Sequence, residues 1–294
     1  MPSFLVDLAQ NIVNGIMLGG IYALLAVGLN IIFGVVKVVN FAQGEYMMLA
    51  MYASYWLFTL LHIDPLLSII PVSIIFFVFG WLTFRFPVKN VVGKGDYAQI
   101  ALTMGLTTFF IGAAQLLWKT DYRGVFVPYS VWGIDLSGIK VGVPQLLALT
   151  YSVVSTIILD RFLTKTDTGR AMLAVAQDEI ASRIVGINVE RIYYLAWSIG
   201  ILLSSAAAGI LVTFLYVHPN VGQQYILYAF VVIVLGGMGS YRGALIGSFI
   251  LGVVQSLATI YISADLSIAI VYTVFVLLLL FKPSGLFGKR VVRA

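Results

Sequence analysis

Charged residues are almost absent from eight long stretches of this sequence and gather in the short segments between them. The uncharged stretches are residues 8–36, 46–63, 65–84, 97–118, 141–159, 192–241, 243–264 and 266–281. Seven of them are 16 to 29 residues long, and the eighth, of 50 residues, is long enough for two crossings and a turn. A helix rises about 1.5 Å per residue, so roughly 20 apolar residues span the ~30 Å hydrocarbon core of a bilayer. The pattern predicts an all-α polytopic membrane protein.

Composition excludes the main alternatives to this prediction. The chain is 61% hydrophobic and 10% charged, whereas soluble globular domains carry about 25% charged residues. A membrane β-barrel would show alternating segments of roughly ten residues instead of continuous apolar runs. The net charge of +5 does not indicate nucleic-acid binding, because the basic residues flank the apolar runs as the positive-inside rule describes. The absence of cysteine excludes thiol and disulfide chemistry.

We expect one transmembrane domain over residues 1–294, a bundle of about eight to ten helices. The predicted crossings are 12–34, 46–61, 66–84, 99–118, 143–159, 192–214, 226–240, 244–262 and 266–281. Segment 226–240 is short and ends in glycines, so it could be a half-helix or a re-entrant segment. The loops on one side then contain 14 of the 17 basic residues, including those of segment 160–191 and of the C-terminus. This excess predicts that both lie in the cytoplasm and that the N-terminus lies outside.

The predicted spans lack the residues that most ion-coupled carriers and enzymes need. No Asp, Glu, Lys or Arg lies in the middle of any span, and both histidines, His62 and His218, lie at span ends. Proton relays usually keep a carboxylate or histidine inside the bundle. No phosphate-binding loop of the G-x-x-x-x-G-K-[ST] type is present either. We expect no catalytic, metal or cofactor site, and uphill transport by this chain would take its energy from another subunit.

Two polar or glycine-rich interruptions and several small residues stand out within the apolar sequence. The interruptions are 39–46, with Asn40, Gln43 and Glu45, and 236–243, with Gly237 and Gly239. Each is either a tight cytoplasmic turn or part of a gate or solute pathway, where broken helices are tolerated. Small residues at four-residue spacing indicate close helix packing, inside the bundle or against a second subunit. The packing positions are Gly15, Gly19, Gly243 and Gly247.

Segment 160–191 predicts a short helix outside the membrane. Asp167 or Thr168 is a plausible N-cap, and Gly186 is a plausible C-terminal stop. Between them, apolar residues recur at helical spacing over about 15 residues. They are Met172, Val175, Ala176, Ile180 and Ile184. This apolar stripe could lie on the lipid surface or dock into a groove on a soluble partner.

Five ordered motifs spread over the whole chain resemble the permease subunits of ABC importers, specifically the LivH-type subunit of the branched-chain amino acid family. They are GIMLGGIYALLAVGLN at 15–30, VNFAQGEYMML at 39–49, TGRAMLAVAQD at 168–178, VLGGMGSYRGALIG at 234–247 and FKPSGLFG at 281–288. The resemblance implies that segment 160–191 carries a coupling helix that docks on an ATPase. The Glu-Ala-Ala-x-x-x-Gly pattern of that helix departs here to Ile180-Ala181-Ser182-x-x-x-Gly186, with Glu179 one position early. The coupling residues it implies are Arg170, Met172, Val175, Ala176, Glu179, Ile180, Ala181 and Gly186.

The resemblance also implies a heteromeric importer in a bacterial inner membrane. Its other parts would be a second permease, LivM-like or a like copy, two cytoplasmic ATPases that bind ATP and magnesium, and an external solute-binding protein. The cargo would be a branched-chain amino acid. An importer for urea or short amides, and an ion-coupled carrier acting alone, remain as alternatives. Loop 119–142, with Tyr122, Phe126, Tyr129 and Trp132, is either an interfacial aromatic belt or a seat for the binding protein.

Overall fold

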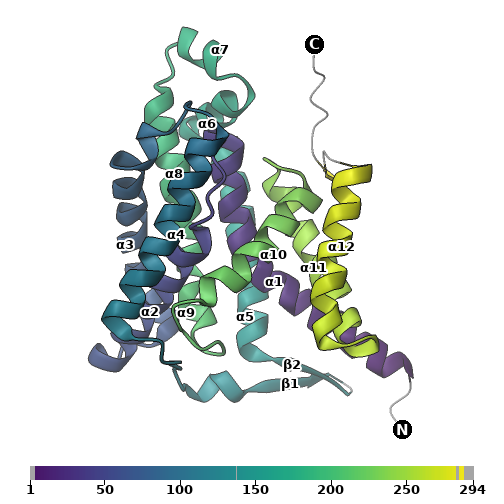
Figure 1. Ribbon diagram of the computed structural model, residues 1–294. Coiled ribbons are helices and arrows are strands. Elements are labelled where there is room, and N and C mark those ends of the chain that lie inside the picture. The colour runs from purple at the N-terminus through teal and green to yellow at the C-terminus, as the bar shows by residue number, and fades with distance from the viewer. Residues whose placement is uncertain (1–3, 137, 283–284, 288–294) are drawn as a thin grey trace.

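The computed structural model describes residues 4–136, 138–282 and 285–287, and these form a bundle of helices (Figure 1). Six helical segments are long and apolar enough to cross a membrane. They contain α1 (Phe4–Val36), α3 (Pro65–Arg85), α4 (Asp96–Trp118), α5 (Val143–Lys165), α8 (Val189–Ala206) with α9 (Ala208–Leu211), and α11 (Tyr241–Tyr261). Two further apolar helices, α10 (Val221–Gly236) and α12 (Ala264–Phe281), are shorter, and α2 spans Gln43–Leu61. The predicted all-α polytopic membrane fold is confirmed.

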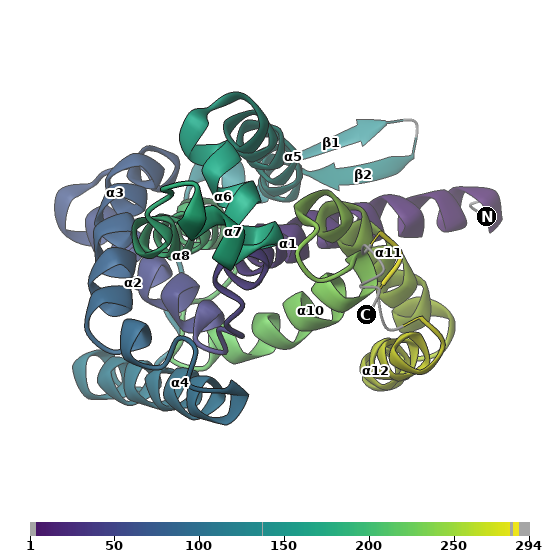
Figure 2. The same ribbon diagram turned by 90° about the horizontal axis from the view of Figure 1, so that it is seen from above.

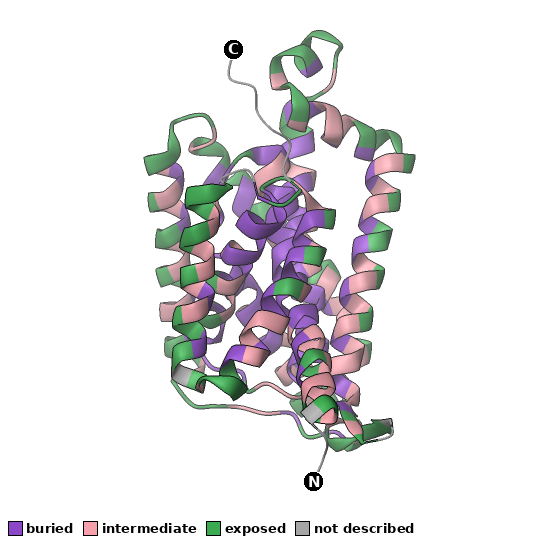
Figure 3. Cartoon of the chain, turned by 90° about the vertical axis from the view of Figure 1, so that its right-hand side faces the viewer, coloured by how far each residue is buried: buried purple, intermediate pink, exposed green. Residues whose placement is uncertain are grey.

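Helix α1 lies at the centre of the bundle and packs against α5, α8, α10 and α11. Its middle is buried, and exposed apolar residues cover the outer helices, as expected where lipid replaces water (Figure 3). Gly15 and Gly19 let α1 approach α11 closely, since a Cβ on them would lie 2.5 Å from Val253 Cα and 2.6 Å from Ser248 O. A Cβ on Gly243 would meet Gly236 O, and Gly247 faces Leu235. These four glycines therefore pack inside this chain.

The two ends of the bundle differ. Helices α6 (Asp167–Gln177) and α7 (Glu179–Ile184) lie at one end, which we call the α7 end, together with the C-terminal end of α12 (Figure 1). The N-terminal end of α1 and the hairpin of β1 (Gly133–Leu136) and β2 (Ile139–Gly142) lie at the other, the hairpin end. Of the 14 basic residues predicted on one side of the membrane, those that the structure describes are on segments of the α7 end. Lys289, Arg290 and Arg293 lie outside the described residues.

Loop 119–142 closes the hairpin end. Tyr129 donates a hydrogen bond of 2.8 Å to Asp64 Oδ1, and the same oxygen caps α3 by accepting from Leu66 N. The backbone of Arg123 pairs with that of Val217, which ties this loop to the segment before α10. Tyr122, Phe126 and Trp132 are exposed, an arrangement compatible with either role expected for this loop.

Helix α2 begins inside the bundle and not at its surface. Its first residue, Gln43, bonds to Gly200 and Ser204 of α8. Gly200 lies 11 residues into α8, about 16 Å below its start at 1.5 Å per residue, which is near the middle of a bilayer. The start of α10 is at the same depth, since a Cβ on Gly222 would touch the backbone of Gly44 at 2.5 Å. The interpretation of 39–46 as a tight surface turn is therefore wrong: the chain runs back into the bundle before α2 starts.

Candidate functional site

Segment 160–191 folds as two helices joined at a bend. The prediction of one helix of about 15 residues is wrong, because α6 ends at Gln177 and α7 begins at Glu179. Asp178 between them has extended backbone angles, and its carboxylate accepts a hydrogen bond of 2.9 Å from Ala181 N, so it caps α7. The N-cap of α6 is Thr166, whose hydroxyl accepts from Gly169 N, and not Asp167 or Thr168.

The bend divides the predicted apolar stripe between two environments. Met172 and Val175 of α6 are completely buried against the bundle. Ile180 and Ile184 of α7, with Val185 after it, are 73%, 80% and 75% exposed. Met172 and Val175 are therefore unavailable to a soluble partner in this structure, and the accessible apolar surface is that of α7, which stands out from the bundle (Figure 1).

Of the other predicted coupling residues, Glu179 and Ala181 are on α7, Gly186 follows it, and Arg170 and Ala176 are on α6. Arg170, Ala181 and Gly186 are exposed, whereas Ala176 is half-buried. Glu179 accepts a hydrogen bond of 2.8 Å from Arg183 Nη2, one turn along α7. This hydrogen bond, with a further one from Tyr193, lowers the pKa of the Glu179 carboxyl. The carboxylate form of Glu179 is thus favoured by Arg183 of its own helix and by Tyr193 of α8.

Asn40 and Gln43 form a polar joint between the start of α2 and α8. Asn40 Nδ2 donates to Gln43 Oε1 at 2.9 Å, and Asn40 Oδ1 accepts from Ala42 N. Gln43 Nε2 donates to Gly200 O at 2.9 Å and to Ser204 Oγ at 2.8 Å. Both side chains are completely buried. They satisfy backbone groups of a chain break at membrane depth, where an unpaired group would cost several kcal/mol.

Glu45 lies two residues into α2 and is completely buried, and neither carboxylate oxygen has a hydrogen-bond partner among the described residues. The sequence predicts no acidic residue in the middle of a span, whereas the structure buries Glu45 inside the bundle. Sequence counting places Glu45 outside the span that starts at 46, but the chain enters the bundle earlier. An ionisable group inside a membrane bundle is costly and indicates function.

Asn30 of α1 holds residues 237–240 of the second interruption, 236–243. Asn30 Oδ1 accepts from Gly239 N at 2.5 Å, and its Nδ2 donates to Ser240 O at 3.0 Å and to Gly237 O at 3.4 Å. Gly237 and Gly239 have φ values of 98° and 86°, which side chains other than glycine rarely adopt. Gly239 also contacts Gly34 near the end of α1. The two interruptions therefore lie on either side of α1, and Val39 and Gly239 line one cavity of about 890 Å³ at the α7 end.

No group of three or more His, Asp or Glu that could hold a metal ion is found among the described residues. A family model described as the permease component of branched-chain amino acid transport systems matches residues 11–281. The chain belongs to this family. It is 27% identical to the high-affinity branched-chain amino acid permease BraD of Pseudomonas aeruginosa, over 95% of each chain. It is also 27% identical to LivH of Escherichia coli K12, again over 95% of each chain. A ribose import permease of Bacillus subtilis, RbsC, is 31% identical over 56% of this chain and 53% of its own. No solved structure matches.

Sequence reasoning missed Asn30 in this branched-chain amino acid transport permease. The residue ends the first motif and is surrounded by apolar residues, so its position within a predicted span was the available signal. What the sequence did not show is its partner, because Asn30 and the glycine loop are about 210 residues apart.

Proposed function

We propose that this chain is the membrane-spanning subunit of an ATP-driven importer that carries branched-chain amino acids into the cytoplasm. The family match over residues 11–281 supports this most strongly, and the names of full-length relatives agree with it. The chain itself is a transport subunit and not an enzyme. In this proposal the α7 end and the C-terminus face the cytoplasm of a bacterial inner membrane, in accord with the 14-to-3 distribution of basic residues.

ATP hydrolysis is assigned to two partner ATPases that dock on α7. Ile180, Ile184 and Val185 form an exposed apolar surface on a helix outside the bundle, the kind of surface that seats in a partner's groove. Movement of α7 would reach the bundle through α6, whose Met172 and Val175 are buried in it. A second permease and an external binding protein at the hairpin end complete the assembly.

Ile180→Asp tests the docking surface. We expect loss of ATPase co-purification and of transport, because a carboxylate would replace an apolar contact, while the melting temperature of the permease stays unchanged. Phe126→Asp, at an equally exposed site of the hairpin end, is the matched control and should retain the ATPases. Met172→Asp should instead destabilise the permease by burying a charge. Normal ATPase recovery with Ile180→Asp would exclude α7 as the docking element.

We assign the pathway or gate to Asn40, Gln43, Glu45, Gly237 and Gly239, of which Glu45 is the sharpest test. Glu45→Gln keeps the shape of the side chain and removes the cost of a buried unpaired acid. If Glu45 contacts the cargo during transport, Glu45→Gln should lower the transport rate without lowering the melting temperature. Unaltered transport in this variant would remove Glu45 from the pathway.

The cargo is tested with the complete importer in liposomes. Labelled leucine should accumulate only with ATP, the ATPases and the binding protein present, and labelled urea should not compete. Accumulation of urea in place of leucine would change the cargo and keep the importer class. Uptake by the purified permease alone, without ATP, would overturn the importer assignment in favour of a self-sufficient carrier.

A further inference from the structure

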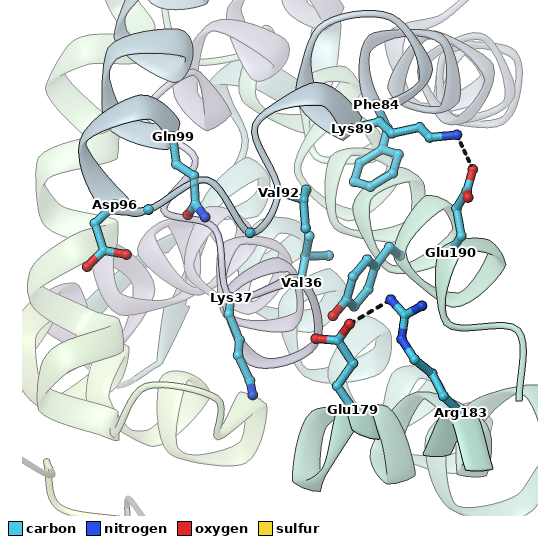
Figure 4. A pocket seen from close by; sticks show the side chains of 13 residues that line it. Val36, Lys37, Phe84, Lys89, Val92, Asp96, Gln99, Glu179, Arg183 and Glu190 are labelled. Carbon is cyan, nitrogen blue, oxygen red and sulfur yellow. Dashed lines mark hydrogen bonds and ion pairs between the residues drawn. The ribbon is translucent and has the colours of Figure 1, made fainter. Parts of the chain in front are cut away.

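A pocket of about 590 Å³ lies at the α7 end, between the ends of α1 and α4 on one side and α7 and α8 on the other (Figure 4). It adjoins the cavity of about 890 Å³ described above, because Lys37, Asp96 and Gln99 line both. Pockets of this size hold small-molecule ligands. Neither the coupling surface nor the two interruptions accounts for its polar lining.

The charges around the two cavities are paired, with two exceptions. Lys89 pairs with Glu190 at 2.5 Å and Arg183 with Glu179 at 2.8 Å, as the dashed lines in Figure 4 show. In the adjoining cavity, Arg242 Nε donates to Asp160 Oδ1 at 2.7 Å. Within the described part of the chain, the ammonium of Lys37 and the carboxylate of Asp96 have neither a hydrogen bond nor an ion pair, although the charge of Lys37 contributes to lowering the pKa of Glu179. Lys37 and Asp96 are therefore a cation and an anion that can each pair with a ligand.

Gln99 adds an independent indication of a ligand. Its residue is only 8% exposed, its side-chain amide has no hydrogen-bond partner among the described residues, and it lines both cavities. The amide oxygen and nitrogen are reached from the cavity and are not fully buried, so they can bond a polar group there. Gln99 and Asp96 lie on one side of the pocket, away from the two ion pairs, and Lys37 lies between them and Glu179 (Figure 4).

The ligand that this lining fits is small, carries both charges and has an apolar part. Val36, Phe84 and Val92 supply an apolar wall. We propose that this pocket binds a zwitterionic aliphatic amino acid from the cytoplasmic side, with its carboxylate on Lys37 and Gln99 and its ammonium on Asp96. The inference rests on the proposed function, because the imported cargo is such a molecule and would accumulate on that side.

Occupancy of this pocket would rise with the cytoplasmic concentration of the cargo, so binding there would make the importer respond to that concentration. The pocket joins α1 and α4 of the bundle to α7 and α8, the elements that would follow the ATPases. A ligand held by the α1 and α4 side occupies the space that separates it from α7 and α8, so it resists any state in which this pocket closes. By linkage, the ligand and the ATPase-driven movement then oppose each other, so cytoplasmic leucine inhibits import.

The test is direct titration of the assembled importer, without its binding protein, in phosphatidylcholine nanodiscs. L-leucine should bind wild type, and Lys37→Gln, Asp96→Asn and Gln99→Leu should each weaken binding roughly tenfold or more, as expected for loss of a charged hydrogen bond. Lys94→Gln, which removes an exposed charge that does not line the pocket, is the matched control and should bind normally. The melting temperature of each variant is measured in the same nanodiscs.

Two analogues that each carry only one of the two charged groups of leucine test Lys37 and Asp96 separately. 4-Methylpentanoate lacks the amine, so its weak binding should be lost in Lys37→Gln and kept in Asp96→Asn, and 3-methylbutylamine should show the reverse. Equal leucine affinity in Lys37→Gln and Lys94→Gln would overturn the site. Displacement of leucine by glycerophosphoethanolamine, at equal or lower concentration, would reassign the pocket to a zwitterionic lipid headgroup and also overturn it.

Two measurements distinguish the inhibitory effect from the proposed function. Leucine on the ATPase side should slow ATP hydrolysis stimulated by the binding protein, and Lys37→Gln should relieve the inhibition by about tenfold in leucine concentration. Normal leucine import with no such inhibition would refute the regulatory inference and leave the function intact. Absence of leucine import by the complete wild-type importer would refute the function instead.

Discussion

The tie between Asn30 and the glycine loop predicts a large effect of one buried side chain. Asn30 is 1% exposed and makes hydrogen bonds of 2.5, 3.0 and 3.4 Å to the loop. Each such bond contributes about 1 kcal/mol, and the longest contributes least. Asn30→Ala removes all three and leaves buried loop carbonyls without a donor. We expect a loss of about 2–3 kcal/mol, which lowers the melting midpoint by roughly 5 °C or more.

Two further variants make this measurement specific. Asn14→Ala is the control on the same helix, because Asn14 is exposed and, among the described residues, its side chain accepts a single hydrogen bond, from Gln10. Its effect should stay within about 0.5 kcal/mol. Asn30→Asp retains the acceptor for Gly239 N but loses both bonds donated to Gly237 O and Ser240 O. It should therefore be at least as damaging as Asn30→Ala. Equal melting temperatures for Asn30→Ala and Asn14→Ala, measured in one detergent, would refute the structural role of Asn30.

The remaining predictions concern the crossing of α2 with α10 and the helix α7. Gly222→Ala would place its Cβ 2.5 Å from the Gly44 backbone, so it should destabilise the permease by about 1–3 kcal/mol. Gly105→Ala, with open space around it, is the control and should be neutral. Equal melting temperatures of the two variants would contradict this prediction. The Glu179 pKa is lowered in the fold, so its stabilisation of α7 is complete above its ordinary pKa and is lost as the pH falls through the lowered value. The protection factors of the α7 amides, which correct for the slower intrinsic exchange in acid, should therefore fall as the pH is lowered. Arg183→Gln, which removes the principal partner of Glu179, should flatten that pH dependence.

Periodicity and charge predicted the parts of this fold that depend on one element at a time. The uncharged runs located α1, α3, α4, α5, α8 and α11, because a helix that faces lipid has to be long and apolar in its own sequence. The same reasoning located α2 to within three residues but missed that it begins inside the bundle. Its start is set by Asn40 and Gln43, which satisfy the backbone break from within, and their partners Gly200 and Ser204 lie about 160 residues away.

The coupling segment shows the same limit at shorter range. The apolar spacing from Met172 to Ile184 fits one continuous helix, and nothing in that spacing marks a bend. Asp178 supplies the bend because its carboxylate caps a new helix. Only the structure shows that the residues before it face the bundle and those after it face outward.

The position of the two interruptions offers a physical reason for placing movement at the α7 end. Helices α2 and α10 both begin inside the bundle, and their first turns meet where Gly44 contacts Gly222. α10 then runs from this crossing to the glycine loop, passing between α4 and α12 when seen from the α7 end (Figure 2). A helix that starts at mid-depth can tilt without moving the hairpin end, since its first residues act as a pivot, while its last residues swing with the loop that Asn30 holds. The bonds from Asn30 to that loop would then have to break or move whenever the bundle changes state.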